Sequence, residues 1–298
     1  MIRVLGTVFA ALLGLAFGSF LNVCLSRWPE GESIIHPRSH CRQCGRTLAW
    51  WENVPLFSWL ALRGRCRDCG AWIGWRYVIV EAAVGALWAV EGWRLSTFFQ
   101  SADLASPISD PYVDTWVAVI TAASQAVLYW LLVALAALDA EHLWLPNLIT
   151  MPGIIVGFLV SITLSGLESL PGYLGQNLVL TLEKELLGIA SAAALILLIR
   201  WIYWLVRRRE GLGLGDAKLM ALLAAWLGLP VALLALGLGV VLGAILAVAI
   251  LLIPRHPLQP ERWALLKLPL GSFLCIGGIV SALWGREIVD AYLRWAGF

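Results

Sequence analysis

The chain has 298 residues, of which 60% are hydrophobic and only 13% are charged. A soluble domain carries about 25% charged residues, so this composition excludes an ordinary soluble globular protein. The formal net charge of +2 excludes a strongly acidic or basic chain, and the placement of the charges is more informative than their sum.

Apolar segments recur along the chain, and each is long enough, or nearly long enough, to cross a bilayer, which takes roughly 20 apolar residues. The first has one preceding Arg and no clear small-residue cleavage site, so we interpret it as a retained helix and not as a signal peptide. A tight turn at Leu229-Pro230 is expected between the sixth and the seventh. The eight segments are residues 4–24, 78–93, 115–138, 148–165, 186–206, 212–228, 231–253 and 268–284.

Positive charges are concentrated in alternate loops, and cytoplasmic loops of membrane proteins carry an excess of Lys and Arg. The long loop at 25–77 contains eight arginines, the fifth segment ends in Arg207-Arg208-Arg209, and three cations precede the eighth segment. With eight segments these regions share one side, so we expect the long loop in the cytoplasm and both termini outside. Four acidic residues interleave with the eight arginines of the loop, so no nucleic-acid partner is expected.

Four of the six cysteines lie in the long loop as two matched pairs, Cys41-x-x-Cys44 and Cys66-x-x-Cys69, and a Gly follows each pair. Each pair can chelate a metal through two thiolates, and two pairs complete the tetrahedral ligand set of structural zinc. Two disulfides are a weaker interpretation, because the cytosol is reducing. Since no ligand position is left open for catalysis, we predict a structural Zn site.

Two aspartates lie at the ends of apolar segments, where ionisable groups are costly and are functional candidates by default. Asp139 closes the third segment, and Asp216 opens the sixth within a glycine-rich stretch at 211–219. Two carboxylates that share a proton can activate a water and polarise a peptide carbonyl. Each Asp can also be an ordinary boundary charge or helix cap. Glu81, near the start of the second segment, is a third candidate that snorkelling to the interface explains comparably well.

These features together resemble the bacterial type IV prepilin peptidases, also called prepilin leader peptidases and N-methyltransferases. The G-x-G-D element alone is shared with other intramembrane aspartyl peptidases, and the cysteine loop makes the combination specific. Trp51 stands where many members have Tyr. The resemblance is carried by Phe17-Gly-Ser-Phe-Leu-Asn-Val23, Pro37-Arg-Ser-His-Cys41, Trp50-Trp-Glu-Asn-Val-Pro-Leu56, Leu62-Arg-Gly-Arg-Cys-Arg67, Arg76-Tyr77, Glu81, Asp139, Leu145-Pro-Asn147, Gly213-Leu-Gly-Asp-Ala-Lys-Leu219 and Leu268-Pro-Leu-Gly-Ser-Phe273.

The resemblance implies an all-α integral membrane protein of the bacterial inner membrane, with about eight transmembrane helices and a cytoplasmic zinc-knuckle loop between the first two. It implies an aspartyl endopeptidase, with Asp139 and Asp216 as catalytic residues on the cytoplasmic side. Its substrates would be prepilins or pseudopilins of type IV pili or type II secretion, embedded in membrane lipids, from which it removes a short basic leader.

The resemblance also implies a second activity, methylation of the new N-terminal amine with S-adenosylmethionine. The sequence itself shows no glycine-rich strand–turn–helix for that cofactor. We expect residues 1–110 to form the N-terminal, methyltransferase part and residues 111–298 to form a six-helix peptidase domain.

Two alternatives stay open. One is a peptidase that lacks methyltransferase activity. The other is a non-catalytic membrane scaffold or transporter whose zinc knuckle is a docking module. A transporter would favour a charged site at the middle of the bilayer, and the boundary position of both aspartates argues against it.

Overall fold

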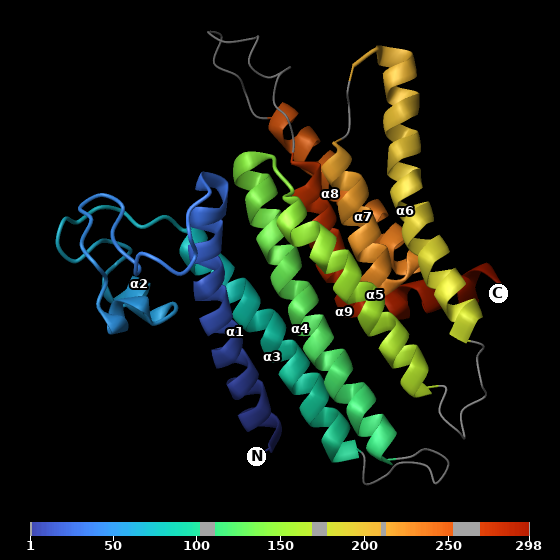
Figure 1. The fold of residues 1–298 in the computed structure, drawn as a ribbon, viewed down its shortest axis with the longest axis horizontal. Coiled ribbons are helices and arrows are strands. Elements are labelled where there is room, and N and C mark those ends of the chain that lie inside the picture. The colour runs from blue at the N-terminus through green and yellow to red at the C-terminus, as the bar shows by residue number, and fades with distance from the viewer. Residues whose placement is uncertain (1, 102–110, 169–177, 210–212, 253–268, 298) are drawn as a thin grey trace. The chain divides into compact units, whose positions relative to one another are not determined.

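The computed structural model describes residues 2–101, 111–168, 178–209, 213–252 and 269–297, and this part of the chain is helical with no strand (Figure 1). An all-α fold is expected of a chain in lipid, because a helix satisfies its own backbone hydrogen bonds. The long helices are α1 (Ile2–Arg27), α3 (Arg76–Ser101), α4 (Pro111–His142), α5 (Asn147–Glu168), α6 (Leu178–Arg207), α7 (Leu214–Leu227), α8 (Leu229–Leu252) and α9 (Leu270–Ala296). The short helices η1 (Trp28–Glu30), η2 (Trp50–Asn53) and α2 (Phe57–Ala61) lie in the loop between α1 and α3.

The eight long helices coincide with the eight predicted apolar segments, so the predicted all-α membrane fold is confirmed. Six of them, all except α3 and α7, are long and apolar enough to cross a membrane by themselves. α7 has only 14 residues, and α3 carries two buried glutamates, so the count of eight spans is approximate. The cations expected before the eighth segment, Arg255, Arg262 and Lys267, lie outside the described residues, as does the proposed boundary at residue 110.

The turn between the sixth and seventh segments is built by Gly228, one residue before the expected position. Gly228 has φ +77°, and its N–H donates to the Ala224 carbonyl at 2.9 Å. A residue with a positive φ at the end of a helix is usually Gly, because it has no Cβ. Pro230 then lies in the first turn of α8, where its missing N–H costs nothing.

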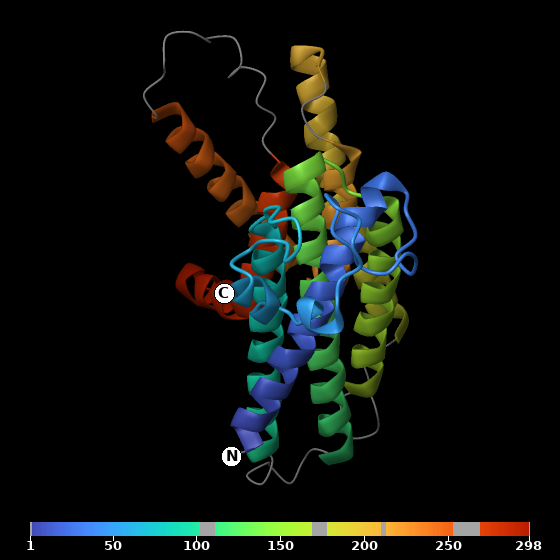
Figure 2. The ribbon, with the colours of Figure 1, turned by 90° about the vertical axis from the view of Figure 1, so that its left-hand side faces the viewer.

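The chain divides into two compact units, Met1–Ala134 and Leu135–Phe298, and the division falls inside α4. In the first unit α1 and α3 run side by side, as Figures 1 and 2 both show. Two glycines of α1 permit this close packing. A Cβ on Gly14 would lie 2.8 Å from the Trp88 Cβ, and one on Gly18 would lie 2.8 Å from the Glu81 Cα.

In the second unit α7 is the central helix and packs against α5, α6, α8 and α9. Nine of its 14 residues are buried, from Asp216 at its start to Ala225. A helix that is apolar on all sides and surrounded by other helices belongs in a protein core. The sequence of α7 therefore places Asp216 inside the helical bundle.

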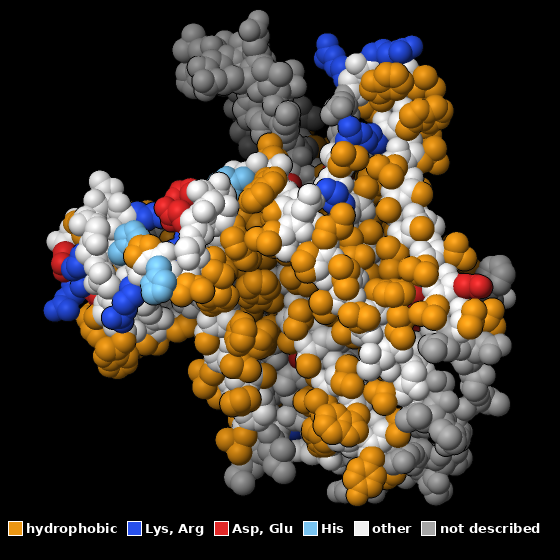
Figure 3. Space-filling view, viewed as in Figure 1, with side chains coloured by type: hydrophobic (Ala, Val, Ile, Leu, Met, Phe, Trp, Pro, Cys, Tyr) orange, Lys and Arg blue, Asp and Glu red, His pale blue; other side chains and the backbone are white. Residues whose placement is uncertain are grey.

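Hydrophobic side chains cover the visible surfaces of the long helices in Figure 3, whereas charged side chains gather on the loop between α1 and α3 and at helix ends. The outward side chains of α1 are large and apolar: Val4, Leu5, Val8, Phe9 and Leu12 are each at least 49% exposed. Exposed apolar surface on this scale is stable only against lipid or another protein. The described helices therefore form a multi-pass membrane protein.

Candidate functional site

The second unit brings Asp139 and Asp216 together, although 77 residues separate them in the sequence. Asp139 lies in the last turn of α4 and is 6% exposed, and Asp216 lies in the first turn of α7 and is 8% exposed. The Asp139 carboxyl group lies near enough for its charge to influence that of Asp216. Two buried, interacting carboxyl groups have the arrangement that lets one accept a proton while the other donates one.

Each of the two carboxylates is held by backbone N–H groups at the start of a helix. Asp216 Oδ2 accepts a 3.0 Å hydrogen bond from the Gly213 N–H, just before its own helix. Asp139 Oδ2 accepts a 2.6 Å bond from the Ser272 N–H in the first turn of α9. The first N–H groups of a helix have no partner inside the helix, so they are available to an oxygen ligand. Helix starts in this unit therefore position both side chains.

Two residues that the sequence reasoning did not single out complete this arrangement. The Ser272 hydroxyl contacts Asp139 Oδ2 at 3.1 Å and the Ala136 carbonyl at 2.9 Å, so it joins the first turn of α9 to the end of α4. A Cβ on Gly271 would lie 2.9 Å from the Asp139 carboxyl carbon. The signal for both residues was present in the Leu-Pro-Leu-Gly-Ser-Phe stretch near the end of the chain, which was used only as a mark of resemblance.

Cys275, like Cys24, is most simply a buried apolar residue when judged from the sequence. The structure places its thiol in the core, fully buried, and within reach of the charges of Asp139 and Asp216. It follows Ser272 by about one helical turn, so it lies on the same side of α9 as the hydroxyl that contacts Asp139.

Lys218 follows Asp216 by two residues on α7, and residues two apart on a helix face different directions. Its Nζ donates a 2.6 Å hydrogen bond to Asn147 Oδ1 at the start of α5. Leu145, two residues before that Asn, packs against Gly215 and Gly271. The segment between α4 and α5 therefore lies against the first turns of both α7 and α9, through Leu145 and Asn147.

In the first unit, the four loop cysteines converge. Their sulfur atoms all lie within 4.8 Å of one another, and Cys41 Sγ is 3.7 Å from Cys69 Sγ. A metal with four Zn–S bonds of about 2.3 Å would hold its sulfurs about 3.8 Å apart. All four are free cysteines, so no disulfide competes for them. The spacing and the donor set fit a tetrahedral metal ion.

The two cysteine pairs fold into the same knuckle, repeated 25 residues later. In the first knuckle the Cys41 N–H donates to the Arg46 carbonyl at 2.9 Å, and in the second the Cys66 N–H donates to the Ala71 carbonyl at 2.8 Å. Gly45 and Gly70, with φ +73° and +68°, turn the chain back in each. The backbone N–H groups of Cys69 and Asp68 lower the pKa of the Cys66 thiol to about 6, and a thiolate is the form that binds metal.

An ion-pair network joins the two knuckles. Arg46, which ends the first knuckle, contacts Glu52 Oε1 at 2.6 Å and Asp68 Oδ2 at 2.8 Å, and Asp68 lies between the cysteines of the second knuckle. Glu52 Oε2 also accepts a 2.7 Å hydrogen bond from the Ala49 N–H. The hydrogen bond from Arg46 is the largest of the effects that lower the pKa of the Glu52 carboxyl.

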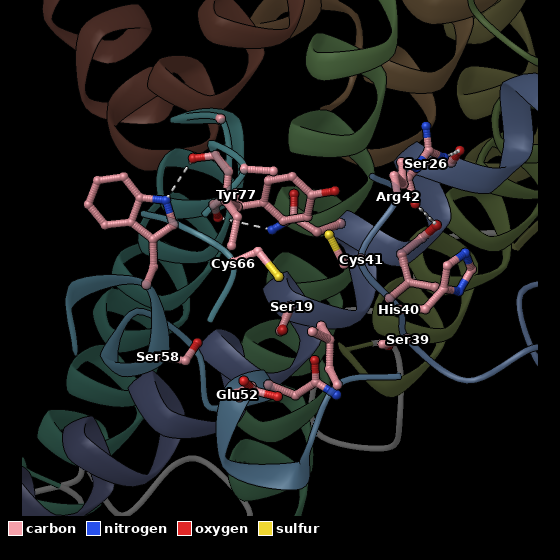
Figure 4. Close-up of a pocket in the computed structure, with 18 of the residues that line it drawn as sticks. Ser19, Ser26, Ser39, His40, Cys41, Arg42, Glu52, Ser58, Cys66 and Tyr77 are labelled. Atoms are coloured by element: carbon pink, nitrogen blue, oxygen red, sulfur yellow. Dashed lines mark hydrogen bonds between the residues drawn. The ribbon is translucent and has the colours of Figure 1, made fainter. Parts of the chain in front are cut away.

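A cavity of about 660 Å³ lies beside the knuckles, within the first unit. Figure 4 shows that its lining comes from three parts of the chain: Ser19 from α1, Cys41 and Cys66 from the loop, and Tyr77 from α3. Glu81, the third acidic candidate, also lines it and is 7% exposed, so it is a buried group and does not reach the interface by snorkelling. The volume suits a small-molecule or peptide-terminus ligand.

Comparison with known proteins assigns both halves of the chain. Residues 12–95 match the Bacterial Peptidase A24 N-terminal domain, and residues 126–248 match the Type IV leader peptidase family. The chain belongs to the type IV leader peptidase family.

Several curated proteins of this family are similar over nearly their whole length. A prepilin leader peptidase/N-methyltransferase of Stutzerimonas stutzeri is 30% identical, over 96% of this chain and 93% of the relative. A protein with the same description from Pseudomonas aeruginosa is 31% identical, over 96% of this chain and 93% of the relative. Another from Pseudomonas putida is 32% identical, over 97% of this chain and 94% of the relative. No solved structure matches the chain.

Proposed function

We propose that this protein is a membrane aspartyl endopeptidase that removes the short basic leader of prepilins or pseudopilins. The observation that carries the proposal is the pairing of buried Asp139 and Asp216 in a chain of the leader peptidase family. In this mechanism one carboxylate takes a proton from the attacking water, and the other, protonated, donates a hydrogen bond to the scissile carbonyl. No covalent intermediate is required.

The cleavage site is expected at the cytoplasmic face of the bacterial inner membrane. α6 ends at Arg207, next to Arg208 and Arg209, and α7 with Asp216 begins only a few residues later. Cations concentrated at one end of the spans mark the cytoplasmic side. A prepilin would lie in the bilayer as a helix, so that its basic leader and its cleavage site are both at this face.

We further propose that the four loop cysteines hold one structural zinc ion and that the N-terminal part, within residues 1–110, methylates the new N-terminal amine. The zinc would fix the two knuckles, since no coordination position is left open for a substrate. S-adenosylmethionine would supply the methyl group. The cavity beside the knuckles fits such a ligand, because it contains a buried acceptor oxygen, Asn22 Oδ1, that has no hydrogen-bond partner.

Mass spectrometry of a purified prepilin incubated with membranes that contain this protein tests the proposal. Loss of the leader mass is expected, followed by a gain of one methyl group on the new N-terminus when S-adenosylmethionine is present. Cleavage without the methyl gain would support the peptidase that lacks the second activity. An unchanged prepilin mass would point to the scaffold or transporter alternative.

Gly271→Ala is expected to lower the rate of cleavage by about 10²-fold. The added methyl group would meet the Asp139 carboxylate at 2.9 Å and push it away from its position. A displacement of about 1 Å in a catalytic group is enough for a loss of this size. The measurement is the initial rate of leader removal. Gly237→Ala is the matched control, because a Cβ there meets nothing within 4 Å, and a similar loss in both variants would contradict the argument.

Glu52→Gln is expected to speed the loss of zinc to a chelator at neutral pH. Arg46 lowers the pKa of the folded Glu52, so the ion pair stabilises the loop above the ordinary pKa of Glu and is lost as the pH falls through the lowered value. The difference between variant and wild type should therefore shrink at low pH. Glu32→Gln, at an exposed position, is the control and should release zinc like the wild type.

A further inference from the structure

Two buried side chains with acceptor oxygens, Asn22 and Glu81, line the cavity in the first unit, which several arginines also line. Asn22, on α1, is only 2% exposed, and its Nδ2 donates a 2.9 Å hydrogen bond to the Tyr77 carbonyl oxygen. A carbonyl can only accept, so this bond fixes the orientation of the amide. Asn22 Oδ1 is thereby held as an acceptor, and it is buried without a hydrogen-bond partner. An unsatisfied buried oxygen is costly unless a ligand supplies a donor.

Glu81 adds a buried carboxylate to the same floor. Its Oε2 accepts a 2.8 Å hydrogen bond from the Leu56 N–H, and the side chains of Ser19 and Asn22 are its other polar neighbours. In the described part of the chain Glu81 forms no ion pair with a Lys or Arg. A buried carboxylate normally has a cationic partner, so this negative charge is without its usual compensation.

The second buried glutamate of α3, Glu91, has a cationic partner and serves as a comparison for Glu81. Glu91, 5% exposed, contacts Arg94 Nη1 at 3.1 Å and accepts a 3.1 Å hydrogen bond from the Tyr129 hydroxyl. It does not line the cavity. Glu91 therefore has a cation supplied by its own helix, whereas Glu81 has only neutral hydrogen-bond partners and lines the cavity.

We infer that Asn22, Glu81 and Ser19 form a binding site for a primary amine in its ammonium form. An ammonium group has three N–H donors, and the three side chains offer three acceptors together with the opposite charge. This inference rests on the proposed function, which brings two such amines to the protein: the N-terminus that cleavage creates, and the α-amino group of the methyl donor. Both sources share the chemistry that the site recognises.

The helix packing explains why the site is deep. Gly18 of α1 lets the backbone of that helix approach Glu81, and its neighbour Ser19 is thereby brought to the cavity. Leu56, which donates to Glu81, has φ +59°, a conformation that a residue with a side chain rarely adopts. The loop is thus held against α3 at the carboxylate, and the site is formed before any ligand binds.

The test is the binding of paired probes to the full-length protein in detergent. The first pair is the tripeptide Phe-Ala-Ala amide and its N-acetyl form, and the second is S-adenosylhomocysteine and its analogue without the α-amino group. In at least one pair the wild type should bind the free amine at least about tenfold more tightly, as a charge-assisted hydrogen bond implies. Glu81→Gln should lose this preference, because it removes the negative charge but keeps the shape.

Glu91→Gln is the matched control and should keep the preference, since Glu91 lies outside the cavity. Ser19→Ala, which removes one acceptor and leaves the carboxylate, should weaken the preference and serves as the second variant if Glu81→Gln is poorly folded. Loss of preference in the peptide pair assigns the site to the new N-terminus, and loss in the second pair assigns it to the methyl donor.

The inference is overturned if the wild type shows no preference in either pair, or if Glu81→Gln keeps the preference of the wild type. Prepilin cleavage by the wild type, measured separately by mass spectrometry, decides the proposed function. A protein that cleaves prepilin but binds free and blocked amines equally would support the peptidase proposal and contradict the amine site.

Discussion

Asp139→Asn and Asp216→Asn should each slow leader removal by at least about 10³-fold. The amide has nearly the same size as the carboxyl group but cannot take a proton from water or pass one to a carbonyl, and acid–base catalysis by one group contributes about 10²–10⁴-fold. The two losses should not add in the double variant, because the two groups act as one unit. The measurement is the single-turnover rate of cleavage of a purified prepilin.

Asp290→Asn provides the control, since Asp290 is an exposed residue of α9 in the same unit. It should cleave prepilin like the wild type. Normal yield and helicity of all three variants would show that the fold is retained. Cleavage at more than a tenth of the wild-type rate by either Asp139→Asn or Asp216→Asn would exclude an aspartyl mechanism at this pair. Such a result would favour the scaffold or transporter alternative.

The wild-type protein should contain about one zinc ion per chain, and Cys66→Ser should lose it. Binding of structural zinc to four protein ligands contributes roughly 10–16 kcal/mol to folding at neutral pH. A knuckle that lacks one thiolate loses much of this free energy, so we expect it to unfold. Cys66 is the most buried of the four and has a thiol pKa of about 6. Elemental analysis after dialysis gives the zinc content, and limited proteolysis between α1 and α3 reports the loss of the folded loop.

Cys24→Ala is the matched control, because Cys24 is a buried cysteine of α1 outside the metal cluster. It should keep the full zinc content and the protease resistance of the loop. A wild-type protein that is free of metal and still has a protease-resistant loop would contradict the zinc proposal. Loss of zinc from Cys24→Ala as well would mean that the loop responds to any disturbance of α1.

The knuckle loop shows how much a local pattern can predict. The spacing of the cysteines and the Gly after each pair define the turn within a few residues, so the same hydrogen bonds appear in both knuckles without help from distant parts of the chain. The contacts of Arg46 with Glu52 and Asp68 were not predicted, because ion pairs depend on where each knuckle lies in space.

The surroundings of the aspartate pair could not be predicted from local sequence patterns. The cost of burying charge near a membrane identified Asp139 and Asp216 as candidates, one at the end and one at the start of an apolar segment. The donors that hold Asp139 come from Ser272, 133 residues away in the sequence. No periodicity or spacing connects those positions.

The amino-acid sequence was enough to predict the membrane class, the eight helical segments and the two cysteine knuckles, and to select Asp139 and Asp216 as candidates, because hydrophobicity, Cys spacing and turn chemistry act over short stretches of chain. Helix packing, which the sequence did not predict, brings the first turn of α9 against Asp139, surrounds α7 with four helices, and places Asn22 and Glu81 in one cavity. These features depend on contacts between residues far apart in the sequence. Such contacts are set by the packing of whole helices, through close approaches such as that of Gly18 to Glu81.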